Sequence, residues 1–278
     1  MAYGHASSDI GQGASDGRDP IVDQIIRSGH QRQLTFRAQF AITWLILIVG
    51  IVYLLAGGRR GLDGDFIVEW FPFILGGAAT TVAISGIAIV GAVVLAIFGA
   101  MGRLSVNPWI NGTASLYVSL VRGTPLLVQI FFAYYALAEV GLVLPGIVAG
   151  TAALAFNYGA YMTEVFRAGI QAVPRGQREA ARALGMRERV VFWRIVIPQA
   201  FRIVTPAIGN EFIAMLKDSS LVFVIGVGEL LWRAQAAGRP NVRIFEALLV
   251  AALVYWILTI IFTLFQERLE RRMARADR

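Results

Sequence analysis

Long apolar stretches alternate with shorter polar ones along most of this 278-residue chain. A helix needs about 20 apolar residues to cross roughly 30 Å of hydrocarbon at about 1.5 Å per residue. Six stretches of about this length predict an all-α integral membrane protein with about six transmembrane helices. They lie near residues 39–57, 74–100, 115–138, 146–168, 203–226 and 244–266.

Two polar segments frame this pattern. Residues 1–37 are rich in Gly, Ser and Asp, which predicts a largely disordered tail. An N-terminal transmembrane helix is expected to follow over residues 38–58. Between the fourth and fifth apolar stretches, residues 169–202 form a long charged insert that contains the sequence REAARALGMRERVVFWRIVIPQA.

The insert predicts two short helices joined at a glycine. Arg178–Leu184 is rich in alanine, a strong helix former, and Gly185 suits the end of that helix. A helical pattern resumes over Arg187–Ile197, and Pro198 is expected to end it. Composition alone also allows a simpler interpretation, in which these basic helices lie against anionic lipid head groups.

Arginine residues gather beside alternate apolar stretches. They precede the first stretch, follow the second and the fourth, and close the chain. Because an excess of Arg and Lys marks the cytoplasmic side of a membrane protein, six spans place both termini and the insert in the cytoplasm. The last outer loop is an exception to the asymmetry, since it holds Arg233, Arg239 and Arg243.

Composition excludes several classes of function. The chain is 57% hydrophobic and 15% charged, with a mean hydropathy of +0.64 and no cysteine, which rules out disulfides and thiolate chemistry. The net charge is +7, and the basic residues cluster beside the apolar stretches, as membrane topology requires. They form no basic stripe of the kind that binds nucleic acid. The single lysine, Lys217, follows no Gly-rich loop, so the chain has no P-loop for ATP.

Polar residues inside the fourth predicted span are candidates for a solute pathway. Asn157, Tyr161 and Glu164 occur at i, i+4 and i+7, which places them on one face of a helix. A carboxylate within a membrane needs either a partner or water. Glu164 therefore either lines a pathway or fixes the helix end by pairing with Arg167 or Arg202.

Lys217, Asp218 and Ser219 interrupt the fifth predicted span. Adjacent helical residues point about 100° apart, so Lys217 and Asp218 need not pair with each other. A polar break of this kind can unwind a helix and present backbone groups to a zwitterionic solute. The alternative is a structural ion pair between helices, such as Lys217 with Glu164.

The charged insert resembles the EAA loop of the permease subunits of ABC importers. Glu-Ala-Ala at 179–181, Gly185 and Ile-Val-Ile-Pro at 195–198 have the intervals of that loop, with Ile197 in place of the usual Leu. In that family, the first helix of the loop sits in a cleft of a cytoplasmic ATPase subunit. The resemblance thus implies that docking falls to Glu179, Ala180, Ala181 and Gly185.

Three further blocks are similar to permeases of the polar amino acid uptake group. They are VRGTPLLVQIFF (121–132), NYGAYMTEVFRAGI (157–170) and NEFIAMLKDSSLV (210–222). The similarity covers residues 71–271, which implies a type I ABC importer permease core with 169–202 as its coupling loop and one extra N-terminal helix. Candidate pathway residues are Asn157, Tyr161, Glu164, Lys217, Asp218 and Ser219.

The resemblance also implies partners that this chain does not encode. These are a cytoplasmic ABC ATPase dimer, a second permease subunit that is identical or paralogous, and a periplasmic solute-binding protein. ATP and Mg²⁺ would bind in the ATPase, and no cofactor or enzymatic activity is expected in this chain. The expected function is uptake of a polar amino acid, or a related compound such as an opine, across the bacterial inner membrane.

The alternative is an ATP-independent amino acid carrier or channel. Such a protein would need an inverted internal repeat or a continuous polar pore. The two halves of the sequence show no convincing repeat, and this alternative leaves the spacing of the EAA residues unexplained.

Overall fold

The computed structural model describes residues 35–36, 38–50, 53 and 61–275. The chain divides into two compact units, Met1–Leu62 and Asp63–Arg278. Each unit is considered by itself, and the second contains all the candidate residues.

The first unit contains one described helix over Ala38–Gly50, which is apolar but shorter than a membrane span requires. The predicted tail of residues 1–37 lies outside the described residues, except for Thr35 and Phe36. Much of residues 51–58, the second half of the predicted extra span, also lies outside them. The tail and the extra span therefore stay predictions.

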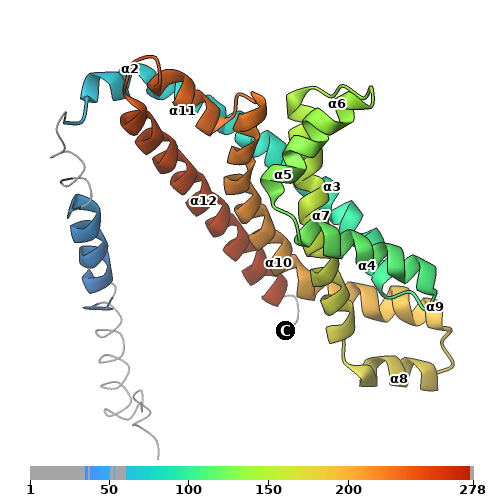
Figure 1. The fold of residues 1–278 in the computed structure, drawn as a ribbon. Helices are drawn as coiled ribbons and strands as arrows, with labels where there is room; N and C mark the ends of the chain where they lie inside the picture. Colours follow the sequence, from blue (N-terminus) through green and yellow to red (C-terminus); the bar gives the residue numbers. More distant parts are fainter. Residues whose placement is uncertain (1–34, 37, 51–52, 54–60, 276–278) are drawn as a thin grey trace, which may run out of the picture. The chain divides into compact units, whose positions relative to one another are not determined.

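The second unit is built from helices joined by short loops. The helices are α2 (Gly64–Leu75), α3 (Gly77–Arg103), α4 (Pro108–Arg122), α5 (Leu126–Phe131), η1 (Phe132–Ala136), α6 (Leu137–Glu139), α7 (Gly146–Ala172), α8 (Arg175–Ala183), α9 (Glu188–Val191), η2 (Phe192–Val196), α10 (Ile197–Asp218), η3 (Ser219–Ile225), α11 (Leu230–Gly238) and α12 (Ile244–Arg275). η1 and η2 are π-helical turns, and η3 is a 3-10 helix. α8 and α9 lie at one end of this unit, whereas α6 and α11 lie at the other (Figure 1). No strand occurs among the described residues, which confirms the predicted all-α class.

Among the described residues, three helical stretches are long and apolar enough to cross a membrane: 64–103, 188–225 and 244–273. α4 and the helix over Leu126–Glu139 would together form a fourth, but they are bent by 106°. α7 is 27 residues long, and it carries polar residues such as Asn157 and Thr163. The membrane character is confirmed, whereas the count of six spans stays a prediction.

The predicted third span over residues 115–138 is wrong as a continuous helix. α4 ends at Arg122, and α5 begins at Leu126 after a sharp bend. Pro125 in the bend has an extended backbone (φ −65°, ψ 138°) and has no N–H to continue a helical ladder. The chain therefore changes direction in the middle of the apolar segment.

The expectation that Pro198 ends a helix is also wrong. α9, η2, α10 and η3 follow one another without a loop from Glu188 to Ile225. Pro198 stands in the first turn of α10, directly after the π-helical turn η2. The altered hydrogen-bond pattern of that turn accommodates a residue that cannot make the ordinary i−4 bond.

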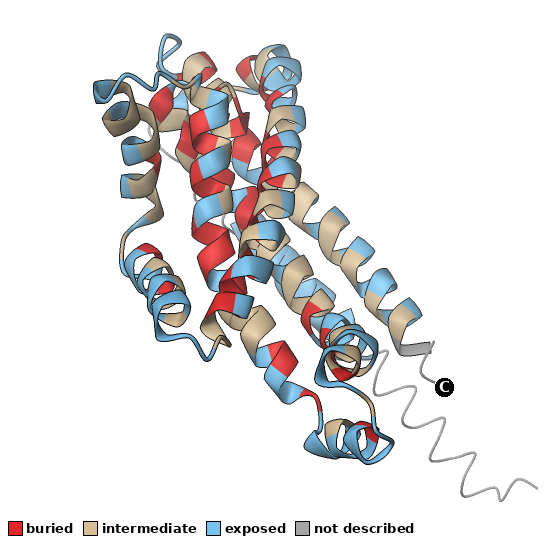
Figure 2. Ribbon diagram, turned by 90° about the vertical axis from the view of Figure 1, so that its right-hand side faces the viewer, coloured by how far each residue is buried: buried red, intermediate tan, exposed pale blue. Residues whose placement is uncertain are grey.

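α3 and α7 form the centre of the second unit. Ala88, Ala92 and Ala96 recur every four residues along α3 and share a buried cluster with Leu154 of α7. Buried residues gather along these central helices in Figure 2. A Cβ atom added at Gly99 would lie only 2.2 Å from Oγ1 of Thr163, so glycine permits the close approach of the two helices.

A buried carboxylate ties the helices together near α11. Glu229 accepts the backbone N–H of Trp232 at 2.7 Å, which caps α11. It also accepts a hydrogen bond from the hydroxyl of Tyr255 in α12 and a long one, 3.5 Å, from Thr81 in α3. Each oxygen of this buried group thus has a donor inside the protein.

Candidate functional site

α8 ends in a turn that favours glycine. The N–H of Gly185 donates to the carbonyl of Arg182 at 2.8 Å, and the N–H of Met186 donates to the carbonyl of Ala181 at 3.1 Å. These two bonds form a Schellman motif, whose central residue has a left-handed backbone. Gly185 has a φ of +74°. The predicted helix end at Gly185 is therefore confirmed.

Of the four residues predicted to dock against an ATPase, Glu179, Ala180 and Ala181 belong to α8 and Gly185 lies in the turn after it. Glu179, Ala180 and Gly185 are exposed, whereas Ala181 is only 4% exposed. Ala181 belongs to a buried cluster that includes Val191. Its side chain therefore holds α8 against the neighbouring helices and presents no surface to a partner.

A salt bridge fixes the corner between α8 and α9. Nε of Arg182 lies 2.6 Å from Oε1 of Glu188. Hydrogen bonding to Glu188 and its negative charge raise the pKa of the Arg182 guanidinium above its usual range. Beside this pair, Leu184 is 82% exposed, so the corner presents an apolar side chain that the sequence analysis did not single out.

Glu164 forms an ion-pair network instead of lining a pocket. Its Oε1 lies 3.1 Å from Nε of Arg103, and its Oε2 lies 2.6 Å from Nη2 of Arg167. Arg103 also donates a hydrogen bond to Ser115, so the network joins α3, α4 and α7. This geometry matches the alternative in which Glu164 fixes a helix end, and its partner is not Lys217.

A polar pocket of about 460 Å³ opens between the break after α4, the middle of α7 and the end of α10. This volume falls within the range of small-molecule sites. The pocket brings together a guanidinium, two carboxylates, an amide and two phenols. Its lining residues are Arg122, Gly123, Thr124, Pro125, Leu126, Asn157, Tyr158, Tyr161, Glu211 and Asp218.

Gln129 satisfies backbone groups that the break between α4 and α5 leaves free. Its Nε2 donates to the carbonyl oxygens of Val121 at 2.8 Å and Thr124 at 3.1 Å. Its Oε1 accepts a hydrogen bond from Nδ2 of Asn157 at 3.1 Å. Irregular backbone at membrane depth needs such partners within the protein. Asn157 thus supports the break from α7 and also lines the pocket.

An arginine and a tyrosine meet at one wall of the pocket. The guanidinium carbon of Arg122 lies 5.1 Å from the centroid of the Tyr161 ring. This cation–π contact orients the positive group without neutralising its charge. Arg122 lines the pocket beside this ring.

Of residues 217–219, only Asp218 lines the pocket. Asp218, the last residue of α10, accepts a hydrogen bond from the hydroxyl of Tyr158 at 2.8 Å. Lys217 is exposed, and the buried Ser219 donates to the carbonyl of Leu216. The predicted polar break is visible as the change from α-helix to 3-10 helix after Asp218.

Three of the pocket residues, Asn157, Tyr161 and Asp218, were predicted from the sequence. Three others were not: Arg122, Tyr158 and Glu211. Glu211 precedes Asp218 by seven residues, or two helical turns, so helical spacing alone would have put both on one face. Tyr158 follows Asn157 in α7. It lines the pocket because of the way α7 packs against its neighbours, which the sequence does not show. Arg122 enters it only because the chain bends after α4.

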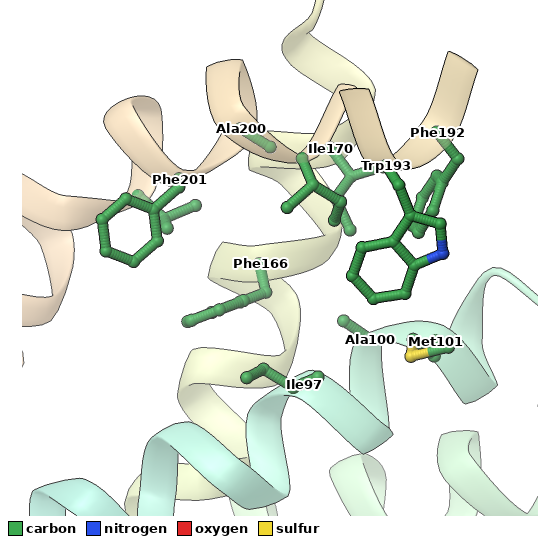
Figure 3. A pocket seen from close by; sticks show the side chains of 11 residues that line it. Ile97, Ala100, Met101, Phe166, Ile170, Phe192, Trp193, Ala200 and Phe201 are labelled. Carbon is green, nitrogen blue, oxygen red and sulfur yellow. The ribbon is translucent and has the colours of Figure 1, made fainter. Parts of the chain in front are cut away.

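A second pocket, of about 210 Å³, is lined by hydrophobic residues of α3, α7, η2 and α10. Phe166, Phe192, Trp193 and Phe201 surround it (Figure 3). It offers no charged group and therefore does not suit a zwitterionic solute. Among the described residues, no group of three or more His, Asp or Glu side chains could hold a metal ion.

Comparison with known proteins gives consistent matches. The family described as binding-protein-dependent transport system inner membrane component matches residues 92–275. The L-cystine transport system permease protein TcyB of Bacillus subtilis (strain 168) is 36% identical over 208 residues, which cover 74% of this chain and 89% of that protein. The arginine transport system permease protein ArtQ of the same organism is 36% identical over 217 residues, or 78% of this chain and 99% of the relative.

A solved structure shares the fold as well as the sequence. The crystal structure of an amino acid ABC transporter with histidines superimposes with a TM-score of 0.73 at 38% identity. The match covers 77% of this chain and 100% of the solved chain. The resemblance to type I ABC importer permeases is thereby confirmed.

Proposed function

This chain belongs to the family of binding-protein-dependent transport system inner membrane components, and from that premise we propose that it carries a polar amino acid across the inner membrane. A related compound such as an opine fits the same proposal. The relatives named above include permeases for cystine and arginine, which supports the amino acid class. The family component is a permease and not the catalytic subunit.

The observation that carries the proposal is the polar pocket with charges of both signs. An amino acid presents a carboxylate and an ammonium group a short distance apart. Arg122 offers the forked donors that suit a carboxylate, and Asp218 offers an acceptor for an ammonium group. The pocket also borders the break after α4 and the helix change after Asp218, where irregular backbone can meet a solute.

α8 would couple this pocket to an ATPase. Glu179, Ala180 and Gly185 give it an exposed docking face, while the buried Ala181 fastens it to the helices behind. Directly after α8, a single helical stretch runs from Glu188 to Ile225 and carries both pocket carboxylates. A displacement of α8 would therefore move the pocket carboxylates through the continuous helical stretch from Glu188 to Ile225.

The partners follow from the family and from the charge pattern. A cytoplasmic ABC ATPase dimer would bind ATP and Mg²⁺, because this chain has no lysine in a Gly-rich loop. A second permease subunit, identical or paralogous, would complete the membrane part, and a periplasmic binding protein would deliver the solute. The arginine asymmetry supports cytoplasmic positions for α8 and for both termini.

Affinity purification in mild detergent, followed by mass spectrometry, tests the assembly. The tagged chain should retain a P-loop ATPase in stoichiometric amount, and Glu179→Lys should release it. Gln177→Lys is the matched control, because Gln177 is also exposed but lies about 200° around the same helix. Recovery of the chain alone, still able to move amino acids in liposomes without ATP, would establish a carrier or channel instead.

A further inference from the structure

The hydrophobic pocket of about 210 Å³ shares no lining residue with the polar pocket. Its walls are the last two turns of α3 and of α7, the turn η2 and the first turns of α10. Trp193 lies at one side of it and Phe201 at the other, with Phe166 of α7 in the middle (Figure 3). Neither the solute pocket nor the docking face of α8 gives this pocket a function.

The hydrophobic pocket is open at the surface of the second unit. Four of its lining side chains are 42–58% exposed, namely Ile97, Met101, Trp193 and Phe201. Two of its walls belong to helical stretches that are long and apolar enough to cross a membrane, 64–103 and 188–225. The pocket lies near the end of the first of these stretches, so a membrane would place it where acyl chains meet head groups.

Two arginines adjoin Trp193 in the sequence. Arg189 precedes it by four residues, which is about one helical turn on the same side, and Arg194 follows it directly. Both arginines are exposed, and neither forms a salt bridge with another described residue. The neighbouring carboxylate, Glu188, is bound to Arg182 at 2.6 Å. The two guanidinium groups are therefore available to an anion from outside the described chain.

Charge, indole and hydrocarbon follow one another along this part of the chain. Arg189 comes first, the half-exposed Trp193 one turn later, and the apolar wall with Phe201 after that. Indole rings concentrate at membrane–water interfaces, between the head groups and the acyl chains. A phospholipid has the same order of groups, with a phosphate, polar ester linkages and an apolar chain. A ligand with an acidic group next to an apolar chain therefore matches both the pocket and its border.

We propose that an anionic phospholipid binds here, with an acyl chain in the hydrophobic pocket and its phosphate at Arg189 and Arg194. Basic pockets between transmembrane helices bind anionic head groups in this way. A zwitterionic lipid could fill the same pocket, but its ammonium group offsets the attraction to the arginines. The proposal does not depend on which solute the chain carries, because the lipid site and the polar pocket have no residue in common.

Native mass spectrometry, which counts bound lipids, tests the proposal on the purified full-length chain with the subunits that it retains. The probes are phosphatidylglycerol and phosphatidylcholine with identical acyl chains. The wild-type protein should bind phosphatidylglycerol about 10-fold or more tightly than phosphatidylcholine. The double change Arg189→Gln and Arg194→Gln should weaken phosphatidylglycerol binding by about 5-fold for each arginine replaced and leave phosphatidylcholine binding unchanged.

A second variant tests the acyl-chain part of the site. Ile97→Trp fills the pocket from its half-exposed wall and should weaken the binding of both lipids alike. Val90→Trp is the matched control, because Val90 is exposed on the same face of α3 two turns earlier and does not line the pocket. Arg268→Gln removes an exposed arginine of α12 outside the pocket and should change neither affinity.

Three outcomes would overturn the proposal. Equal affinity of the wild-type protein for the two lipids would rule out recognition of the head group. An effect of Arg268→Gln as large as that of the double arginine variant would show only a general attraction of lipid to basic residues. Loss of a second permease subunit from Ile97→Trp, with lipid binding unchanged, would make the pocket a contact between subunits. The arginine changes are on exposed side chains, so they test the site even if Ile97→Trp does not fold.

Discussion

The hydroxyl of Tyr158 on α7 donates a hydrogen bond to Asp218 across 2.8 Å, at the point where α10 gives way to a 3-10 helix. This bond joins α7 to the end of α10, where the polar pocket borders the change from α-helix to 3-10 helix. It orients one oxygen of the Asp218 carboxylate, and no hydrogen bond to the other oxygen occurs among the described residues.

Tyr158→Phe should impair transport without unfolding the protein. The phenyl ring keeps its packing, but Asp218 loses the donor that orients it. Because hydrogen bonds to charged groups contribute about 1.5–3 kcal/mol, KM for amino acid uptake should rise by about 10-fold or more. Tyr117→Phe is the matched control, since its hydroxyl donates to the carbonyl of Phe156 outside the pocket. Equal effects of both variants would contradict a role for the Tyr158 bond in binding.

Gly185→Ala should loosen α8. Alanine at a φ of +74° costs about 1–3 kcal/mol, because its Cβ is strained in the left-handed region. Hydrogen exchange of residues 175–186 should therefore accelerate. Gly176→Ala, on the same helix with no atom near the added Cβ, should slow exchange or leave it unchanged. Similar behaviour of the two variants would show that the Schellman turn is not what holds the end of α8.

Gly99→Ala should separate α3 from α7. Its Cβ would overlap Oγ1 of the buried Thr163, and such overpacking costs about 1–3 kcal/mol. The Tm in detergent should fall, and the second change Thr163→Ala should recover part of the loss, because the nearest remaining contact is 3.1 Å. Gly86→Ala, which meets open space, should not lower the Tm. An unchanged Tm for Gly99→Ala would contradict the close packing of the two helices.

Single cysteines test the orientation, because the natural chain has none. Leu184→Cys and Val143→Cys introduce thiols at positions that are 82% and 78% exposed, at the α8 end and beside α6 respectively. A membrane-impermeant maleimide added to intact spheroplasts should label Val143→Cys and spare Leu184→Cys until the membrane is opened. The reverse pattern would place α8 outside the cell.

The length of the apolar stretches predicted the helical class, because a helix satisfies its own backbone groups in lipid and needs about 20 residues to cross it. The first helix of the charged insert was also predictable, since alanine content and Gly185 act locally. The bend after α4 was not, because Gln129 supports it from α5 and Asn157 from α7. Pro198 was expected to end a helix because proline usually does. The helix continues through it, since the π-helical turn before Pro198 accommodates the missing hydrogen bond, and the local sequence does not predict such a turn.

The pocket shows where local reasoning stops. Asn157, Tyr161 and Asp218 were found because polar residues stand out in apolar spans. Glu164 stood out for the same reason, yet it pairs with Arg103, which is 61 residues away in sequence. The sequence alone does not show that Glu164 pairs with arginines whereas Asp218 lines a pocket, because both outcomes depend on tertiary packing.

ATP-driven uptake into proteoliposomes tests the central claim most directly. The permease–ATPase complex, reconstituted with ATP inside and the binding protein outside, should accumulate a radiolabelled polar amino acid. Glu179→Lys should abolish the accumulation, because α8 would no longer dock. Accumulation that persists without ATP, or that Glu179→Lys leaves intact, would contradict the account of a permease driven through α8.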